Sequence, residues 1–138
     1  MSNAAVIAYQ DRGYKFKVNT VQFDGAPEKL GVSLVLHYND FDTVKMLCEA
    51  NQIRRIDVDG DVDEYPSKLS KALRIVYTEY AHIGSIEDIA QEIAQPFSVR
   101  FTYVFMRNIW FVYDAKIERV LPLKRYLGST LNKYIQTV

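Results

Sequence analysis

The sequence predicts a single α+β domain, residues 1–138, in which three to four helices pack on a mainly antiparallel sheet. Three observations lead to this prediction. A chain of 138 residues, 49% of them hydrophobic, is long enough to bury a core without a disulfide or a metal. The ring-rich segment 97–113 has the alternation of a β-hairpin. Two segments before it, 69–80 and 86–93, have the spacing of amphipathic helices.

The N-terminal part is predicted to form strands. Residues 14–18 alternate apolar and lysine side chains, which is typical of a strand with one face in water. At Asn19 and Thr20 the alternation changes phase, which predicts a bulge or a break before the turn at 24–27. Residues 31–38 form a β-branched and leucine-rich run that indicates a buried strand.

A helix is predicted to follow, with Asn39 or Asp40 as its N-cap and its end near Asn51. The side chains of one face recur at helical spacing and are apolar. They are Phe41, Val44, Leu47 and Cys48.

Residues 53–65 are a second hairpin candidate. A three-residue loop at 59–61 places Val58 opposite Val62 on one face, whereas a two-residue loop would place Val58 opposite Asp61. We favour the longer loop, because it pairs two apolar side chains.

Two helices are expected directly before the ring-rich segment. Residues 69–80 carry an uninterrupted apolar stripe, and Gly84 supplies a stop. Ser85 and Asp88 resemble a capping box that starts the second helix, which Pro96 ends.

The ring-rich segment has the sequence FSVRFTYVFMRNIWFVY. A two-residue turn at Arg107 and Asn108 makes both faces of the hairpin apolar near the turn, so each face must be covered by other elements or by a partner. The expected pairs are Met106 with Ile109, Phe105 with Trp110, Val104 with Phe111, and Tyr103 with Val112.

After this hairpin, residues 116–121 are expected to extend the sheet beyond a turn at 114–116. Pro122 then opens a last amphipathic segment, which Gly128 divides if it breaks the helix.

The composition argues against several classes of protein. Seventeen basic and seventeen acidic residues cancel, so no overall field attracts the chain to nucleic acid. The single cysteine, Cys48, excludes an internal disulfide and suits a reducing compartment. The start of the chain lacks a basic region, and no stretch approaches eighteen apolar residues, so we expect neither secretion nor membrane insertion, and a cytoplasmic location.

An acidic cluster lies in the second hairpin candidate. It consists of Asp57, Asp59, Asp61, Asp63 and Glu64. Its spacing fits the start of a calcium-binding loop, but Val62 stands where that loop needs glycine and Lys68 where it needs a bidentate Glu. The other interpretations are a solvated hairpin tip and an acidic knob that docks a basic partner.

No catalytic, cofactor-binding or metal-binding motif is recognisable. His37 and His82 stand outside any metal-ligand spacing, and Cys48 lies on the apolar face of its helix without a basic neighbour on that face. The strand 100–105 invites comparison with the aromatic platform of RNA-binding sheets, although the glycines of that motif are missing.

We therefore expect a small non-enzymatic domain that binds another protein or itself. Many small accessory, immunity and phage-encoded domains share this order of elements, which is an analogy of fold alone. The competing hypotheses are a metal-dependent phosphoester hydrolase built on residues 57–64 and a single-stranded nucleic-acid binding module, which the neutral net charge argues against. The predicted partner-binding residues are Phe101, Tyr103, Phe105, Arg107, Trp110, Asp59, Asp61, Asp63 and Glu64.

Overall fold

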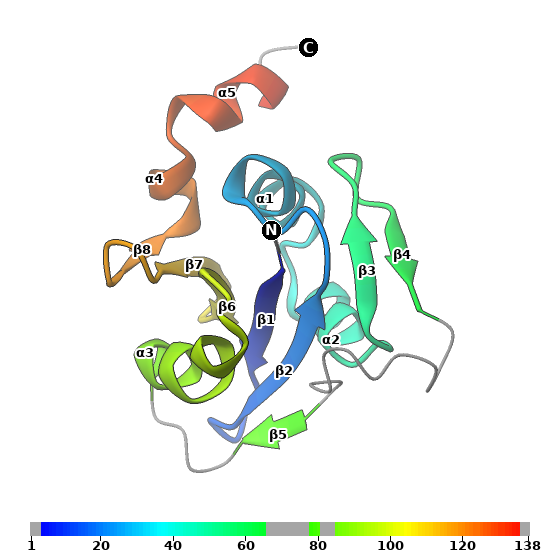
Figure 1. Ribbon diagram of the computed structural model, residues 1–138. Helices are drawn as coiled ribbons and strands as arrows, with labels where there is room; N and C mark the ends of the chain where they lie inside the picture. The colour runs from blue at the N-terminus through cyan, green and yellow to red at the C-terminus, as the bar shows by residue number, and fades with distance from the viewer. Residues whose placement is uncertain (1–3, 66–77, 81–84, 136–138) are drawn as a thin grey trace.

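A computed structural model of the chain describes residues 4–65, 78–80 and 85–135. Their strands form one mixed sheet in the spatial order β4-β3-β2-β1-β6-β7-β8, and β5 pairs with β2 beside this path (Figure 1). The strands are β1 (Ala5–Gln10), β2 (Phe16–Val21), β3 (Ile53–Ile56), β4 (Val62–Glu64), β5 (Thr78–Tyr80), β6 (Phe101–Met106), β7 (Ile109–Asp114) and β8 (Arg119–Pro122).

Antiparallel pairs predominate among these strands. They are β1 with β2, β2 with β5, β3 with β4, β6 with β7, and β7 with β8. The pairs β1 with β6 and β2 with β3 are parallel. The α+β class agrees with the prediction, and the central parallel pair is a feature that the sequence pattern does not reveal.

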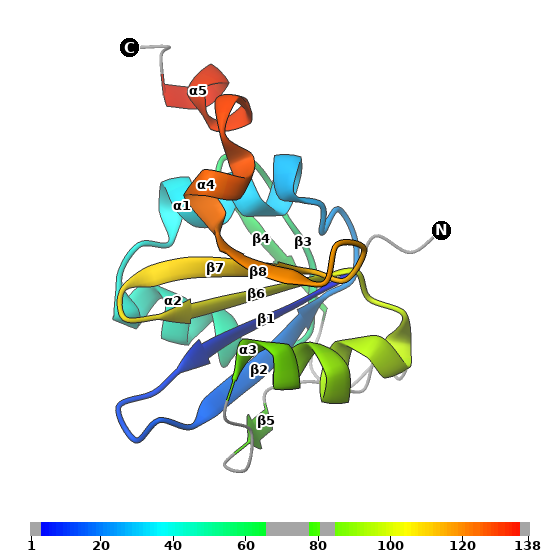
Figure 2. The ribbon, with the colours of Figure 1, turned by 90° about the vertical axis from the view of Figure 1, so that its left-hand side faces the viewer.

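Helices cover both faces of the sheet (Figure 2). On one face lie η1 (Pro27–Gly31), α1 (Val32–His37), α2 (Phe41–Cys48), α4 (Leu123–Leu127) and α5 (Ser129–Ile135). On the other lie α3 (Ile86–Ile89), η2 (Ala90–Ala94) and the short η3 (Gln95–Phe97). The buried side chains accordingly form two hydrophobic clusters, one on each face of the sheet.

The hairpin of β6 and β7 has the predicted register from Tyr103 opposite Val112 to Met106 opposite Ile109. Its turn residues Arg107 and Asn108 have φ values of 55° and 64°. Left-handed values at both positions define the type I′ turn, whose twist matches that of the two strands. This prediction is confirmed.

The same hairpin lies in the interior. Phe101, Tyr103, Phe105 and Trp110 have exposed fractions of 9%, 0%, 3% and 4%, and they pack in the cluster beneath α1, α2 and α4. The expected open aromatic face is therefore wrong, because helices of the same chain cover the side chains that a partner would need to reach. The rings contribute to stability through burial, at about 1.5 to 3 kcal/mol each.

The predicted strand at 31–38 is instead helical. Pro27 stands in the first turn of η1, where its missing N–H costs no hydrogen bond, and η1 runs directly into α1. Leu30, Val32, Leu34 and Val35 are all buried, so the helix lacks a polar stripe. A short apolar run of this kind cannot be distinguished from a buried strand by its period.

β2 is regular where a bulge or a break was expected. Its register with β1 runs without interruption from Phe16 to Val21. Asn19, which disturbs the apolar alternation, is fully buried, and its Nδ2 group lies 3.2–3.3 Å from the carbonyl oxygens of Leu47, Ala50 and Asn51. A buried amide that is hydrogen-bonded to the end of α2 thus takes an apolar position in the strand.

The helix predicted for 69–80 falls mostly outside the described residues. Its last part, Thr78–Tyr80, is strand β5 rather than helix. The cap predictions are confirmed: the side chain of Asp40 accepts from Thr43 N–H, and that of Ser85 accepts from Asp88 N–H. The predicted division at Gly128 separates α4 from α5.

Candidate interaction site at the acidic hairpin

The hairpin of β3 and β4 is present, but its loop is longer than predicted. Ile56 pairs with Val62, so residues 57–61 form the loop. Val58 therefore lies in the loop and not opposite Val62, and it packs partly buried against the cluster beneath α1. The pair of Val58 with Val62, for which the three-residue loop was favoured, does not form, and Val58 finds apolar contacts in the cluster beneath α1 instead.

Backbone hydrogen bonds close this loop. Asp57 N–H donates to Asp61 O and Gly60 N–H donates to Asp57 O, each at 2.9 Å. Asp61 N–H also donates to the side chain of Asp59 at 3.3 Å. The exposed carboxylates of the loop therefore extend from a defined backbone turn.

Two residues at the end of α1, His37 and Tyr38, form hydrogen bonds with carbonyl oxygens of the loop. The Nε2 group of His37 lies 2.9 Å from Val58 O, and because a carbonyl oxygen can only accept, this nitrogen carries the proton. The Tyr38 hydroxyl donates to Gly60 O at 2.6 Å, and Trp110 Nε1–H donates to Tyr38 O at 2.7 Å. The aromatic hairpin and the acidic loop are thus joined through Tyr38, the residue that follows α1.

Burial and, to a lesser degree, the charge of Asp61 raise the pKa of the Tyr38 hydroxyl above its ordinary value. The hydroxyl therefore stays protonated and keeps its donor role at neutral pH.

Gly60 permits this arrangement in two ways. Its φ of 94° is a conformation that side-chain-bearing residues rarely adopt, and an added Cβ would lie 2.8 Å from His37 Cγ. We expect Gly60→Ala to lower the free energy of unfolding by about 1 to 3 kcal/mol, measured by urea denaturation. In a His37→Ala background the contacts with the imidazole ring disappear and only the contact with the Cβ of residue 37, at 3.1 Å, remains, so the same substitution should cost less. An equal cost in both backgrounds would contradict the close approach of His37.

Some acidic residues near the loop have cationic partners. Asp63 pairs with Arg54 at 4.0 Å, and Asp24 pairs with Arg55 at 2.8 Å. Within the described ranges, three exposed carboxylates of the loop form no ion pair with a basic side chain. These three are Asp57, Asp59 and Asp61. Their charge is available to a partner from outside.

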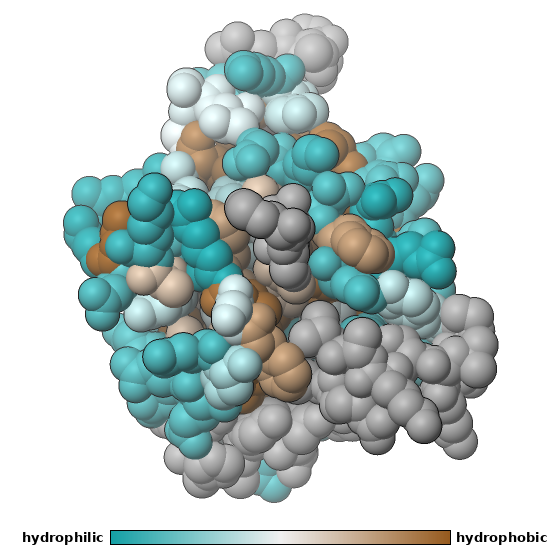
Figure 3. Space-filling model, in the orientation of Figure 1, coloured by the Kyte–Doolittle hydropathy of each residue, from teal (hydrophilic) through white to brown (hydrophobic). Residues whose placement is uncertain are grey.

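Two open depressions adjoin the loop, with volumes of about 430 and 620 Å³. They share Asp57, Val58 and Tyr134, so they form one groove between the loop, α1 and α5. Figure 3 shows that hydrophobic residues on the visible face occur as small separate patches among hydrophilic ones. The lining of the groove includes apolar side chains such as Leu36 and Val58 and carboxylates such as Asp57, together with Lys29 and Lys133 on the side of η1 and α5. The part beside the loop suits a partner segment that carries both basic and apolar side chains.

The predicted site residues do not form one surface. Asp59, Asp61, Asp63 and Glu64 lie together on the exposed hairpin of β3 and β4. Arg107 is also exposed, but it lies at the other end of the sheet, because β6 is parallel to β1 whereas β3 runs antiparallel to both.

The buried rings also have internal partners. Tyr103 donates its hydroxyl to Gly25 O at 2.7 Å, and Phe105 packs edge-on against Trp110. Rings in this position cannot stack on bases, so the aromatic-platform hypothesis has no accessible platform in β6.

Among the described residues, no three His, Cys, Asp or Glu side chains are grouped so that they could hold a metal ion. His82 lies outside these residues. Cys48 is fully buried, and burial, with a smaller contribution from the charge of Glu49, raises the pKa of its thiol far above the ordinary value. A thiol in this state is a core side chain rather than a nucleophile.

A buried carboxylate at the end of β7, which the sequence pattern does not reveal, joins this strand to α4. Asp114, with a side chain only 2% exposed, binds Arg100 through two contacts of 2.8 and 3.0 Å and accepts from the Tyr126 hydroxyl at 2.7 Å. Lys116 N–H donates to it at 2.9 Å. The only sequence signal is an aspartate at the end of an otherwise apolar strand.

These contacts determine the ionisation of Asp114. Burial alone would raise the pKa of its carboxyl, but the hydrogen bonds from Arg100, Tyr126 and Lys116 N–H outweigh burial and leave the pKa below its ordinary value. Asp114 therefore carries a negative charge at neutral pH, and the hydrogen bonds from its neighbours compensate its burial.

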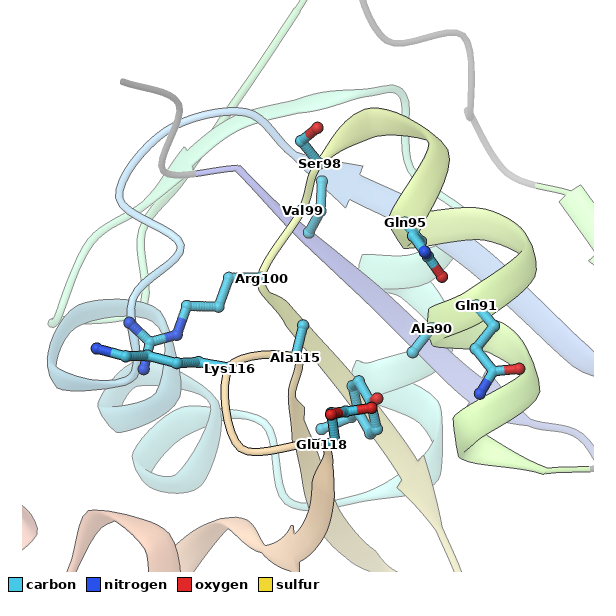
Figure 4. A pocket seen from close by; sticks show the side chains of 10 residues that line it. Ala90, Gln91, Gln95, Ser98, Val99, Arg100, Ala115, Lys116 and Glu118 are labelled. Atoms are coloured by element: carbon cyan, nitrogen blue, oxygen red, sulfur yellow. The ribbon is translucent and has the colours of Figure 1, made fainter.

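An open groove of about 640 Å³ lies between the helix formed by α3 and η2 and the turn after β7 (Figure 4). Figure 4 shows Gln91 and Gln95 on the helix side, whereas the charged ends of Arg100 and Lys116 lie together on the opposite side. Its lining contains one carboxylate, Glu118, and neither histidine nor cysteine. Ser98 and Glu118 both belong to this lining, but among the described residues no hydrogen bond joins them, so no nucleophile is paired with a base there.

No protein family, curated protein or solved structure matches the chain. None of the helices in the described ranges has the length and apolar character that crossing a bilayer requires.

Proposed function

We propose that this chain is a small non-enzymatic protein-binding domain that docks a basic partner on the hairpin of β3 and β4. The binding surface consists of the loop 57–61, the strand β4 and the adjoining groove. The observation that supports this most is the loop itself, in which three exposed carboxylates lack a basic partner among the described residues and stand on a backbone held by His37 and Tyr38.

A held loop favours binding for an energetic reason. Ordering a mobile loop during association costs about 0.5 to 1.5 kcal/mol for each side chain immobilised. The hydrogen bonds from α1 have already fixed the backbone of this loop, so less of that cost remains. Exposed charges at the rim act mainly on the rate and selectivity of association.

The partner surface is expected to be basic with some apolar area. Asp57 and Asp59 line the same depression as partly buried Val58, and a lysine or arginine side chain can cover apolar surface with its stem while its charged end reaches a carboxylate. Binding of this kind weakens with salt, because exposed charges are screened over about 8 Å at physiological ionic strength. The single buried cysteine is compatible with the cytoplasm as the place of action.

A comparative pulldown tests the proposal. We expect D57N/D61N to lose basic proteins that the unaltered chain captures from an extract of the source cell. Neither side chain makes a hydrogen bond or an ion pair within the described part of the chain, so folding should persist. The matched control is D42N/E87Q, which removes two exposed carboxylates from α2 and α3. Capture of the same proteins by all three forms would contradict the proposal.

A further inference from the structure

The two edges of the sheet carry opposite charge. At one edge, the loop and β4, residues 57–64, carry five acidic residues and no basic one, and the two arginines of the neighbouring β3, Arg54 and Arg55, pair with Asp63 and Asp24. At the other edge, residues 116–125, which span β8 and the start of α4, include four basic residues and one acidic. The basic residues are Lys116, Arg119, Lys124 and Arg125, and all four are exposed. The net charge of zero therefore hides a strong polarity across the sheet.

Among the described residues, both ends of the strand order lack a further strand. The strand order ends at β4 on one side and at β8 on the other, and no described strand pairs with the outer side of either. An unpaired edge presents N–H and C=O groups that can pair with another strand.

The charges of the two edges determine which edge-to-edge contacts between copies are favourable. Two acidic edges repel each other, and two basic edges do the same, so neither symmetric pairing is favoured. An acidic edge and a basic edge attract, and the two belong to different ends of the strand order.

From this polarity we infer that the basic partner of the acidic hairpin is a second copy of this chain, which docks through its β8 and α4 edge. The inference rests on the proposed function and names the partner. Because the two contacting surfaces are different, the contact is head-to-tail and leaves one acidic and one basic edge free at the ends of each assembly. Assemblies therefore grow with concentration rather than stopping at a dimer.

Sedimentation velocity at low ionic strength tests this inference. We expect the unaltered chain to form dimers and longer species at high micromolar concentration, and to become monomeric near 1 M salt, where screening acts over about 3 Å. Reversing charge at one edge, with D57K/D61K or with R119E/K124E, should weaken association about tenfold or more. D42K/E87K is the matched control and should assemble like the unaltered chain.

Mixing the two edge variants gives the sharpest result. D57K/D61K retains a basic edge and R119E/K124E retains an acidic edge, so one productive contact remains between them. We expect each variant alone to be monomeric and the mixture to form a one-to-one dimer that cannot extend. Circular dichroism of each variant checks that loss of assembly does not come from unfolding.

A monomeric unaltered chain at every concentration and salt, or a mixture that stays monomeric, overturns the inference. The pulldown distinguishes a failure of this self-assembly inference from a failure of the proposed function. If the chain is monomeric but D57N/D61N still loses captured basic proteins, the partner is a different protein and the proposed function stands. If substitution of Asp57 and Asp61 changes neither assembly nor capture, both the inference and the proposed function are wrong.

Discussion

Replacing Trp110 with alanine is expected to lower the free energy of unfolding by about 3 to 5 kcal/mol. The ring is 4% exposed, packs edge-on against Phe105 and donates its indole N–H to Tyr38 O. Its removal leaves a cavity beneath α1 and an unsatisfied carbonyl at the residue that holds Gly60. Urea denaturation followed by circular dichroism measures the loss.

Trp110→Phe is the matched control, because it keeps an aromatic ring but removes the hydrogen bond. We expect it to cost about 1 to 3 kcal/mol. The fluorescence of Trp110, the single tryptophan of the chain, should be blue-shifted in the native protein and shift to the red on unfolding. An alanine variant as stable as the unaltered chain would show that the ring lies on an open surface, as a partner-binding role for Trp110 would require.

Replacing Asp114 with asparagine is expected to cost about 2 to 3 kcal/mol at neutral pH. Removing one partner from a fully buried ion pair costs about 3 to 5 kcal/mol, and the lower value here reflects the 47% exposure of the Arg100 side chain. The variant leaves the guanidinium and the Tyr126 hydroxyl without the anion that accepts from both.

This cost should depend on pH. The hydrogen bonds from Arg100 and Tyr126 hold the folded-state pKa of Asp114 below its ordinary value, so the folded protein favours the charged form. The resulting stability is fully present above the unfolded pKa, near 4, and is lost as the pH falls through the folded pKa. The difference in unfolding free energy between the unaltered chain and Asp114→Asn should therefore shrink below about pH 4. A difference that stays constant from pH 7 to pH 3 would contradict an ionised Asp114.

The hairpin of β6 and β7 was predictable because its information is local. Asn108 tolerates a positive φ, the turn has two residues, and apolar residues on both sides set the register. The N-caps Asp40 and Ser85 were predictable for the same reason, since a cap is formed within four residues.

Features that depend on distant contacts were not predictable. Residues 31–38 are helical because α4 and the sheet bury them on most sides, and Gly31 lies against Leu123. Asn19 continues a strand because the end of α2, about thirty residues later, supplies its acceptors. Neither partner is visible from the local pattern.

The candidate site was predictable in part. The acidic residues of 57–64 are conspicuous in sequence, and they lie on an exposed hairpin as expected. The roles of His37 and Tyr38 were hidden, because both belong to a segment that sequence patterning assigned to a strand. The placement of the rings was wrong, because the pattern shows that both faces need cover but not that helices of the same chain provide it.

The most direct test of the acidic hairpin as a binding surface is NMR chemical-shift mapping during titration with a basic peptide. Decalysine is added to ¹⁵N-labelled protein at low ionic strength. We predict that the largest shifts occur at residues 57–64 and at His37 and Tyr38, and that they disappear in D57N/D61N but persist in D42N/E87Q. Shifts confined to other exposed carboxylates, or equal shifts in both variants, would contradict the acidic hairpin as the binding surface.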